Sequence, residues 1–213
     1  MNQPPSAPAD SSPLITRHSG YVRFLHWSMA VLYLVVIATG LALYWRKLLG
    51  WMLPFFGGKA PSIAIHFWGG LILMLVTVLL FAVWRNKARW SAADTNFVRH
   101  IGQHALRPDQ PQPEGTGFFN GGQKLYFWSI IITGVIFVLT GIGWWYRREM
   151  PSTYIFCRRT HRFLGVLMSV VFLVHLYKAT IGEPGTLRSM ISGMVTPAWA
   201  RSRRPGWFRD LRR

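Results

Sequence analysis

Cysteine is almost absent from this sequence, since Cys157 is the single cysteine among 213 residues. A disulfide within the chain is therefore excluded, and so is a zinc site or an iron–sulfur cluster held by cysteines of this chain alone. The CxxCH motif that attaches c-type haem is excluded for the same reason.

Acidic residues are also scarce, with seven Asp and Glu against 24 Lys and Arg and a formal net charge of +17. None of the seven falls inside a long apolar run. Proton pumps and cation-coupled transporters commonly carry a carboxylate at membrane depth, so a transporter is disfavoured. High positive charge can indicate nucleic-acid binding, but here it lies in loops and tails. No nucleic-acid partner is expected.

Polar residues are few in four segments, residues 24–45, 63–84, 125–146 and 160–181. Each is long enough to cross a bilayer, which takes about 20 helical residues. Trp and Tyr gather at the segment ends, as in an aromatic belt. Four buried helices of a soluble bundle are the alternative, but such helices usually show a polar stripe. The sequence therefore predicts an all-α integral membrane four-helix bundle within a domain of residues 17–198.

The remaining segments complete this division of the chain. Residues 1–16 are polar and rich in proline, and are expected to form a disordered tail without a signal peptide. NFVRHIGQHALRP, between the second and third segments, fits a short amphipathic helix. Residues 147–159 are expected to form a short loop. The basic, aromatic tail of residues 199–213 suits a lipid headgroup surface or a partner subunit.

The distribution of positive charge predicts the orientation. With Lys178 counted with the C-terminal tail, the N-terminal segment, the loop after residue 84 and that tail hold 16 of the 24 Lys and Arg. The positive-inside rule therefore places both termini in the cytoplasm.

Four of the seven histidines lie within the predicted spans, and ionisable groups at membrane depth are functional candidates by default. With this topology His26 and His175 lie near the inner face, whereas His66 and His161 lie near the outer face. The other histidines, in the tail and the inner loop, are expected to be solvated or to cap helices. They are His18, His100 and His104.

The stretch HRFLGVLMSVVFLVH places an imidazole at each end of an apolar run. His161 and His175 are fourteen residues apart, so they share one face of a helix about 21 Å apart along its axis. This spacing suits two stacked planar groups, and neutral imidazole is a good axial ligand for haem iron. A compact zinc or copper site would need the four histidines together. Nearby glycines fit either room for a macrocycle or close helix packing; they are Gly40, Gly69, Gly70 and Gly165.

Four motifs in order carry a resemblance to a known family: RFLHW, IHFWGG, FFNGGQKLYFW, and a pair of histidines with thirteen residues between them, the second of which begins HLY. The chain resembles the cytochrome b (gamma) subunit of membrane-bound respiratory formate dehydrogenases, from about Arg17 to Arg209. These belong to a wider group of di-haem b cytochromes of hydrogenases and thiosulfate reductases. The NGGQK motif and the tail SMISGMVTPAWARSRRPGW favour the formate dehydrogenase branch.

The resemblance implies two haem b groups and a quinone site. His66 and His161 would ligate the outer haem, and His26 and His175 the inner haem. The quinone site would comprise Asn120, Gly122 and Gln123 together with His175. A glycine turn that caps a helix is the simpler interpretation of NGGQK. Three arginines near the outer haem could pair with haem propionates or with a partner subunit; they are Arg158, Arg159 and Arg162.

The expected function is respiratory electron transfer in the bacterial inner membrane. Electrons would come from an iron–sulfur (beta) subunit on the outer side and pass through two haems to quinone at the cytoplasmic side. A separate molybdenum or tungsten (alpha) subunit would oxidise formate, because no residue here suits that chemistry. The alternatives are a cytochrome b for a nickel–iron hydrogenase or another quinone-linked oxidoreductase, and, less favoured, a haem-free anchor or transporter.

Overall fold

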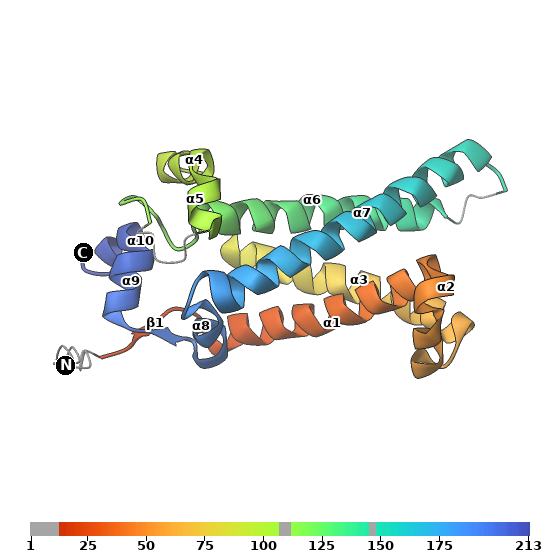
Figure 1. The fold of residues 1–213 in the computed structure, drawn as a ribbon, viewed down its shortest axis with the longest axis horizontal. Coiled ribbons are helices and arrows are strands. Elements are labelled where there is room, and N and C mark those ends of the chain that lie inside the picture. The colour runs from red at the N-terminus through yellow and green to blue at the C-terminus, as the bar shows by residue number, and fades with distance from the viewer. Residues whose placement is uncertain (1–12, 107–111, 145–147) are drawn as a thin grey trace, which may run out of the picture.

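Four long helices lie side by side and form the body of the protein. The computed structural model describes residues 13–106, 112–144 and 148–213. Figure 1 shows the helices α1, α3, α6 and α7 running along its longest axis. Their bounds are Gly20–Tyr44, Lys59–Trp84, Gly121–Gly143 and Pro151–Tyr177. The predicted four-helix bundle is confirmed.

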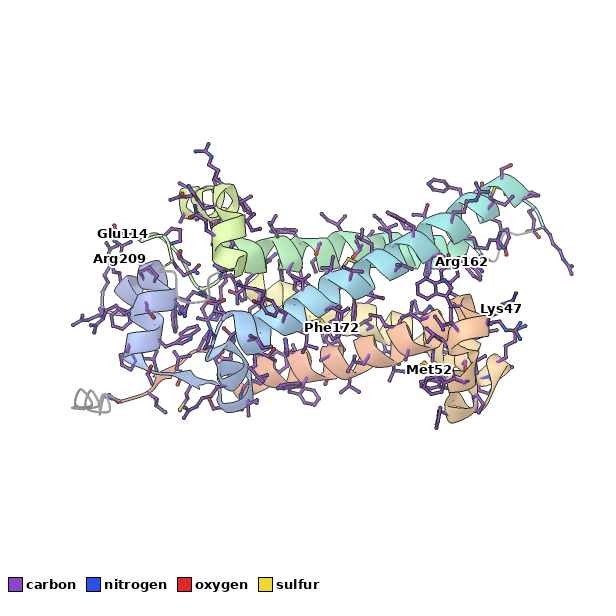
Figure 2. All side chains as sticks on the ribbon, in the orientation of Figure 1. Lys47, Met52, Glu114, Arg162, Phe172 and Arg209 are labelled. Atoms are coloured by element: carbon purple, nitrogen blue, oxygen red, sulfur yellow. The ribbon has the colours of Figure 1, made fainter. Side chains whose placement is uncertain are left out.

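The four helices turn most of their apolar side chains outward. In the most hydrophobic 18-residue window of each helix, between 6% and 17% of the residues are buried. Figure 2 shows side chains projecting outward along the length of the bundle. Soluble bundles bury such residues, whereas a bilayer solvates them. The chain is a multi-pass membrane protein.

The last long helix is longer than predicted. Residues 151–159, expected in a loop, form the first turns of α7, and Pro151 occupies a first-turn position where a missing N–H costs nothing. Figure 1 shows this start of α7 reaching beyond the other helices. The expected loop was wrong because two arginines and a proline look like loop residues but are compatible with a helix that extends out of the bilayer. The predicted end of the third span, residues 145–146, lies outside the described residues.

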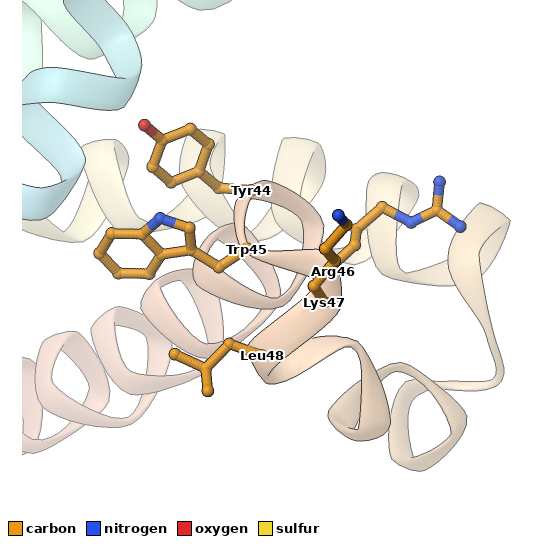
Figure 3. A pocket seen from close by; sticks show the side chains of 5 residues that line it. All are labelled: Tyr44, Trp45, Arg46, Lys47 and Leu48. Carbon is orange, nitrogen blue, oxygen red and sulfur yellow. The ribbon is translucent and has the colours of Figure 1, made fainter.

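At one end of the bundle short helices connect α1 to α3; this end is called the outer end, and the opposite end the inner end, after the predicted orientation. The segments α2 (Arg46–Leu49) and η1 (Gly50–Phe56) fold back across the end of the bundle. Gly57 follows with φ +80°, a conformation that favours glycine. A pocket of about 310 Å³ lies here, and Figure 3 shows the side chains that line it: Tyr44, Trp45, Arg46, Lys47 and Leu48. Aromatic and basic side chains at this level suit the lipid headgroup region.

At the inner end, two short helices replace the single amphipathic helix that was predicted. They are α4 (Ala92–Arg99) and α5 (Ile101–Leu106), and they are interrupted at His100. Phe97 is buried, but the break turns Ile101 into an exposed side chain. A buried ion pair, Lys124 Nζ to Asp94 Oδ2 at 2.6 Å, fastens α4 to the start of α6.

The two ends of the chain fold together at the inner end. The strand β1 (Ile15–Thr16) pairs antiparallel with β2 (Met194–Val195). The predicted disordered tail is therefore too long by at least these two residues, and residues 1–12 lie outside the described residues. The backbone ladder orders Ile15 and Thr16, and polar composition does not reveal such a long-range partner.

The C-terminal segment is folded rather than a free tail. After α7, a π-helical turn (η2, Lys178–Gly182) leads to α8 (Thr186–Ser192), and α9 (Pro197–Arg203) and α10 (Pro205–Asp210) follow β2. The boundary expected at residue 199 falls inside α9. Gly206 packs against backbone oxygens of Gly115 and Thr116, so the tail covers the approach to α6. Figure 1 shows the loop helices and these C-terminal helices at the same end.

Candidate functional site: two histidine pairs and a buried polar cluster

The outer pair of histidines comes from two helices that are distant in sequence. His66 lies on α3 and His161 on α7, and their ring centroids are 6.1 Å apart with 63° between the ring planes. The inner pair joins His26 of α1 to His175 of α7, with centroids 6.4 Å apart and planes at 46°. The structure thus brings together the histidines that share a predicted depth.

The spacing within each pair fits a metal ion held between two imidazoles. A metal bound at about 2 Å by each nitrogen separates the two nitrogens by about 4 Å, and the ring half-widths raise the centroid separation to about 6 Å. Both pairs have this separation. In the described part of the chain, no three His, Cys, Asp or Glu side chains come together as a compact metal site.

The imidazole of His66 is oriented by α1. Its Nδ1 lies 3.0 Å from Val36 O and 3.2 Å from Thr39 Oγ1. The Thr39 hydroxyl donates to Val35 O of its own helix at 2.8 Å. It therefore accepts from the Nδ1–H of His66, which leaves Nε2 unprotonated and free to bind a metal.

The same arrangement orients His161 from α6. Thr140 Oγ1 donates to Ile136 O at 2.7 Å and lies 2.9 Å from His161 Nδ1. The sequence prediction missed both threonines. A signal existed, because each threonine precedes a glycine near the outer end of its span: Thr39-Gly40 and Thr140-Gly141.

Glycines next to the outer pair have two roles. A Cβ on Gly40 would lie 2.7 Å from His66 Cε1, so this glycine makes room for the imidazole itself. A Cβ on Gly70 or Gly165 would meet nothing within 4 Å. The open space at these two positions fits a bulky group beside the histidines.

The inner pair is held differently. His175 stacks on Tyr126 of α6 with ring centroids 4.3 Å apart and planes at 7°. The Nδ1 of His26 is buried and has no hydrogen-bond partner within the described residues. The orientation of the inner imidazoles therefore rests on ring packing rather than on threonine.

Three of the four predicted quinone residues, Asn120, Gly122 and Gln123, lie at the start of α6, where Asn120 is the N-cap, whereas His175 lies on α7. Asn120 Oδ1 accepts from Gln123 N at 2.9 Å, and Gln123 Oε1 accepts from Asn120 N at 3.3 Å. This capping box satisfies two backbone N–H groups. A Cβ on Gly122 would lie 3.2 Å from the Phe97 ring, so Gly122 packs tightly beneath α4. The helix-capping interpretation of NGGQK is correct.

The cap is part of a buried polar cluster that the sequence did not reveal. Asn120 Nδ2 donates to Glu183 Oε2 at 3.5 Å, and Gln123 Oε1 accepts from Arg204 Nη2 at 3.0 Å. Arg204 and Glu183 form an ion pair at 2.6 Å, and both are buried. Burial raises the pKa of the Glu183 carboxyl, but Arg204 and Arg17 lower it further, so the net shift is downward and Glu183 is ionised. This cluster comes from three distant segments of the chain.

His18 differs from the expectation for a tail residue. Its side chain is 5% exposed and lies edge-on to Trp84 and Phe118. Burial, with the charge of Arg17, lowers the pKa of His18 to about 3, so the imidazole is neutral. The expectation of a solvated histidine was wrong because β1 draws residue 18 into the inner end. His100 is exposed, and its Nδ1 lies 3.0 Å from Asn96 O, in accord with a local role at a helix end. The side chain of His104 lies outside the described residues.

The three arginines near His161 do not act as one group. Arg162 lies over the rings of Tyr44 and Trp144, Arg158 lies over Tyr154, and Arg159 is exposed. Figure 2 labels Arg162 near the outer end of the bundle. The cation–π contacts hold Arg162 at the depth of the outer pair.

Taken together, four membrane-spanning helices and two facing histidine pairs define a membrane protein of the b-type cytochrome class. The chain belongs to the prokaryotic cytochrome b561 family, whose model matches residues 17–193. That match includes all four paired histidines.

Curated relatives cover nearly the whole chain. It is 26% identical over 203 residues to the formate dehydrogenase cytochrome b556(fdo) subunit of Escherichia coli K12, covering 93% of this chain and 94% of the relative. Identity to the nitrate-inducible cytochrome b556(Fdn) subunit of the same organism is 23%, covering 94% and 93%. The formate dehydrogenase cytochrome b556 subunit of Haemophilus influenzae is 25% identical, covering 92% of this chain and 83% of the relative.

Proposed function

We propose that this chain is the di-haem cytochrome b subunit of a respiratory formate dehydrogenase. The observation that carries the proposal is the separation of the histidine rings, 6.1 Å in the outer pair and 6.4 Å in the inner pair. Two pairs at a metal-bridging distance, at opposite depths of one bundle, suit two b-type haems. The names of the curated relatives supply the complex.

The residues around the two pairs have separate tasks. His66 and His161 would bind the outer iron through Nε2, with Thr39 and Thr140 holding the Nδ1 protons. His26 and His175 would bind the inner iron. When bound, the two haems supply one-electron carriers on a path across most of the bilayer, because His161 and His175 are about 21 Å apart along α7.

Quinone reduction is assigned to the inner end. The amide of Asn120 suits a quinone carbonyl, because Nδ2 makes only long contacts to Gln112 and Glu183, at 3.4 and 3.5 Å. A quinone oxygen could replace either contact without uncapping α6, because the cap uses Oδ1. Gly122, Gln123 and His175 complete the proposed site. Protons would come from the cytoplasm, and the inward electron movement would build a membrane potential.

The proposed orientation places both termini in the cytoplasm of a bacterial inner membrane. An iron–sulfur subunit would dock on the outer side, where α2, η1 and the start of α7 lie, and a molybdenum or tungsten subunit would oxidise formate. This chain offers no group for that oxidation.

Purification of the tagged chain with its native partners tests the proposal. We expect b-type bands in a reduced-minus-oxidised spectrum, about two haems per chain by pyridine haemochrome assay, and molybdenum or tungsten in the co-purified protein. Formate should reduce both haems, and added quinone should reoxidise them. A colourless chain would reject the haem assignment, and a nickel–iron partner would reject the formate dehydrogenase assignment.

A further inference from the structure

The buried charges at the inner end do not balance. Lys124 is paired with Asp94 and Arg204 with Glu183. Arg17 is 6% exposed, and no carboxylate of the described residues lies within ion-pair distance of it. Burial, together with the charge of Arg204, lowers the pKa of Arg17, and Glu183, which is paired with Arg204, offsets this lowering only in part. A buried guanidinium without a counterion is strongly destabilising, so this position calls for an anion.

Arg17 is nevertheless firmly held. Its Nη2 donates to Phe118 O at 2.8 Å, and its guanidinium lies over the rings of Phe118 and Trp199, 4.5 and 4.9 Å from their centroids. Its backbone N–H donates to Gly193 O at 2.8 Å. The side chain is therefore pre-positioned, and its remaining donor, Nη1, is buried without a partner among the described residues.

Two further N–H donors near Arg17 lack acceptors. Arg17 Nε donates to His18 Nε2 at 3.2 Å, so the neutral imidazole of His18 carries its proton on Nδ1. Within the described residues, both His18 Nδ1 and Trp84 Nε1 are buried without a partner. Buried donors in native proteins are almost always satisfied, so three orphans in one neighbourhood indicate a missing acceptor.

The three donors lie beside the inner histidine pair. The ring of Trp84 is 6.1 Å from that of His18 and 6.5 Å from that of His26. Trp84 therefore lies close both to His18 and to the imidazole that would bind the inner iron. His18 precedes His26 by eight residues on the inner side, where the anionic edge of a haem can leave the hydrocarbon region.

We propose that Arg17, His18 and Trp84 bind a propionate carboxylate of the inner haem. This inference rests on the proposed function, because it requires a haem between His26 and His175. A carboxylate supplies both the negative charge that Arg17 lacks and several lone pairs for the N–H donors. A quinone carbonyl is neutral and cannot balance the charge. The three arginines near His161 remain candidate partners for propionates of the outer haem or for another subunit, whereas Arg17 would serve the inner haem.

Arg17→Gln in the intact complex tests the assignment through the midpoint potentials of the two haems. A positive charge near a haem favours the added electron, so its loss should lower the potential of the inner haem, the one removed by His26→Ala. The outer haem should keep its potential. Arg17→Lys should restore most of the shift. Arg201→Gln is the matched control. Arg201 also lies over an aromatic ring, that of Phe208, but its side chain is exposed.

A second variant keeps the test decisive if Arg17→Gln fails to assemble. Trp84→Phe removes one N–H and retains most of the ring packing, so it should produce a smaller downward shift in the same haem. Unchanged potentials in a variant that retains both haems would overturn the inference while leaving the proposed function intact. Absence of haem from the wild-type complex would instead reject the proposed function.

An anionic lipid phosphate is the competing occupant of this site. Detergent stripping, followed by addition of phosphatidylglycerol vesicles, distinguishes the two. A propionate is part of the haem, so the wild-type potential should not change with lipid. A potential that follows added phosphatidylglycerol in wild type and not in Arg17→Gln would overturn the propionate assignment.

Discussion

The outer and inner histidine pairs have nearly the same ring separation but very different surroundings. Each outer imidazole donates its Nδ1–H to the hydroxyl of a threonine on a neighbouring helix. The Nδ1–Oγ1 distance is 3.2 Å for His66 and Thr39 and 2.9 Å for His161 and Thr140. The inner pair has no such threonine: His175 stacks on Tyr126, and His26 Nδ1 has no partner among the described residues.

The two ends of the bundle also differ in their buried polar groups. Buried ion pairs occur at the inner end only, within the described residues: Lys124 with Asp94, and Arg204 with Glu183. An electron relay needs fixed ligands and little else, whereas quinone chemistry needs polar groups that can bind a headgroup and exchange protons. The contrast therefore supports the proposal of electron relay at the outer end and quinone reduction at the inner end, and four experiments can break or sharpen it.

The largest expected effect is the loss of one haem from each histidine variant. His66→Ala and His161→Ala should lose the same haem, and His26→Ala and His175→Ala the other, because a bis-imidazole site is left with a single ligand. Pyridine haemochrome assay should give about one haem per chain in every case, and redox titration should show which one remains. If His66→Ala and His175→Ala removed the same haem, the outer and inner assignments would be wrong.

The threonines should matter for the outer haem only. Thr140→Val keeps the shape of the side chain but removes the acceptor for His161 Nδ1–H. Loss of such a partner typically lowers metal affinity by about 10- to 100-fold. Thr77→Val is the control, since Thr77 is buried in α3 and donates only to Leu73 O. Haem retention during detergent dilution measures the effect, and equal retention in both variants would contradict an orienting role.

Asn120→Ala should act at the inner end on quinone and on stability together. Loss of a hydrogen bond worth about 1 kcal/mol lowers quinone affinity by roughly fivefold, and loss of the α6 cap costs about 1 kcal/mol of unfolding free energy. Stopped-flow reoxidation of reduced haem at several quinone concentrations measures the first effect.

Ser19→Ala separates the two contributions of Asn120. Ser19 caps α1 by accepting from Val22 N at 3.3 Å, so this variant loses a cap at the inner end and leaves the proposed quinone residues untouched. Its reoxidation kinetics should stay normal. Equal kinetics in Asn120→Ala and wild type would remove Asn120 from the quinone site.

The smallest effect is an acid sensitivity confined to the inner end. The pKa of Glu183 is lowered in the folded protein, so its ion pair stabilises the fold above the ordinary carboxyl pKa, about 4.5. This contribution is lost as the pH falls below 4.5 through the folded pKa. Between pH 6 and 8 the melting temperature should hardly change on this account. In a plot of melting temperature against pH, Glu183→Gln should flatten the acid limb, the part below pH 4.5. An acid limb of the same steepness in Glu183→Gln would exclude this carboxylate as its source.

Much of the fold was predictable because the bilayer imposes a simple rule on sequence. About 20 apolar residues per span identify four helices regardless of how they pack. Helix ends were less predictable: α7 begins at Pro151 instead of residue 160, because charged residues continue a helix into the headgroup region. The predicted limit of the N-terminal tail also differs from the structure. Residues 15 and 16 are ordered because β1 pairs with β2, which lies almost at the other end of the chain.

The candidate site was predictable to the extent that it follows helical periodicity. The depths of the four histidines and the shared face of His161 and His175 come from residue number and topology alone. Thr39 and Thr140 were missed because a threonine in an apolar helix usually bonds to its own backbone, as both also do here. The Thr-Gly dipeptide in two spans becomes meaningful only when a histidine of another helix lies against it.

The sequence by itself determined the class of the protein and its four spans, and it predicted which histidines share a depth, because these depend on hydrophobicity and on position along a helix. The tertiary structure alone decided the surroundings. His18 lies deep beside Trp84, Glu183 meets Arg204 beneath Asn120, and Arg17 is buried without a counterion among the described residues. The contact of His18 with Trp84 and that of Asn120 with Glu183 join residues 66 and 63 positions apart. Burial of a charge depends on which distant groups meet, and a local sequence pattern does not encode this.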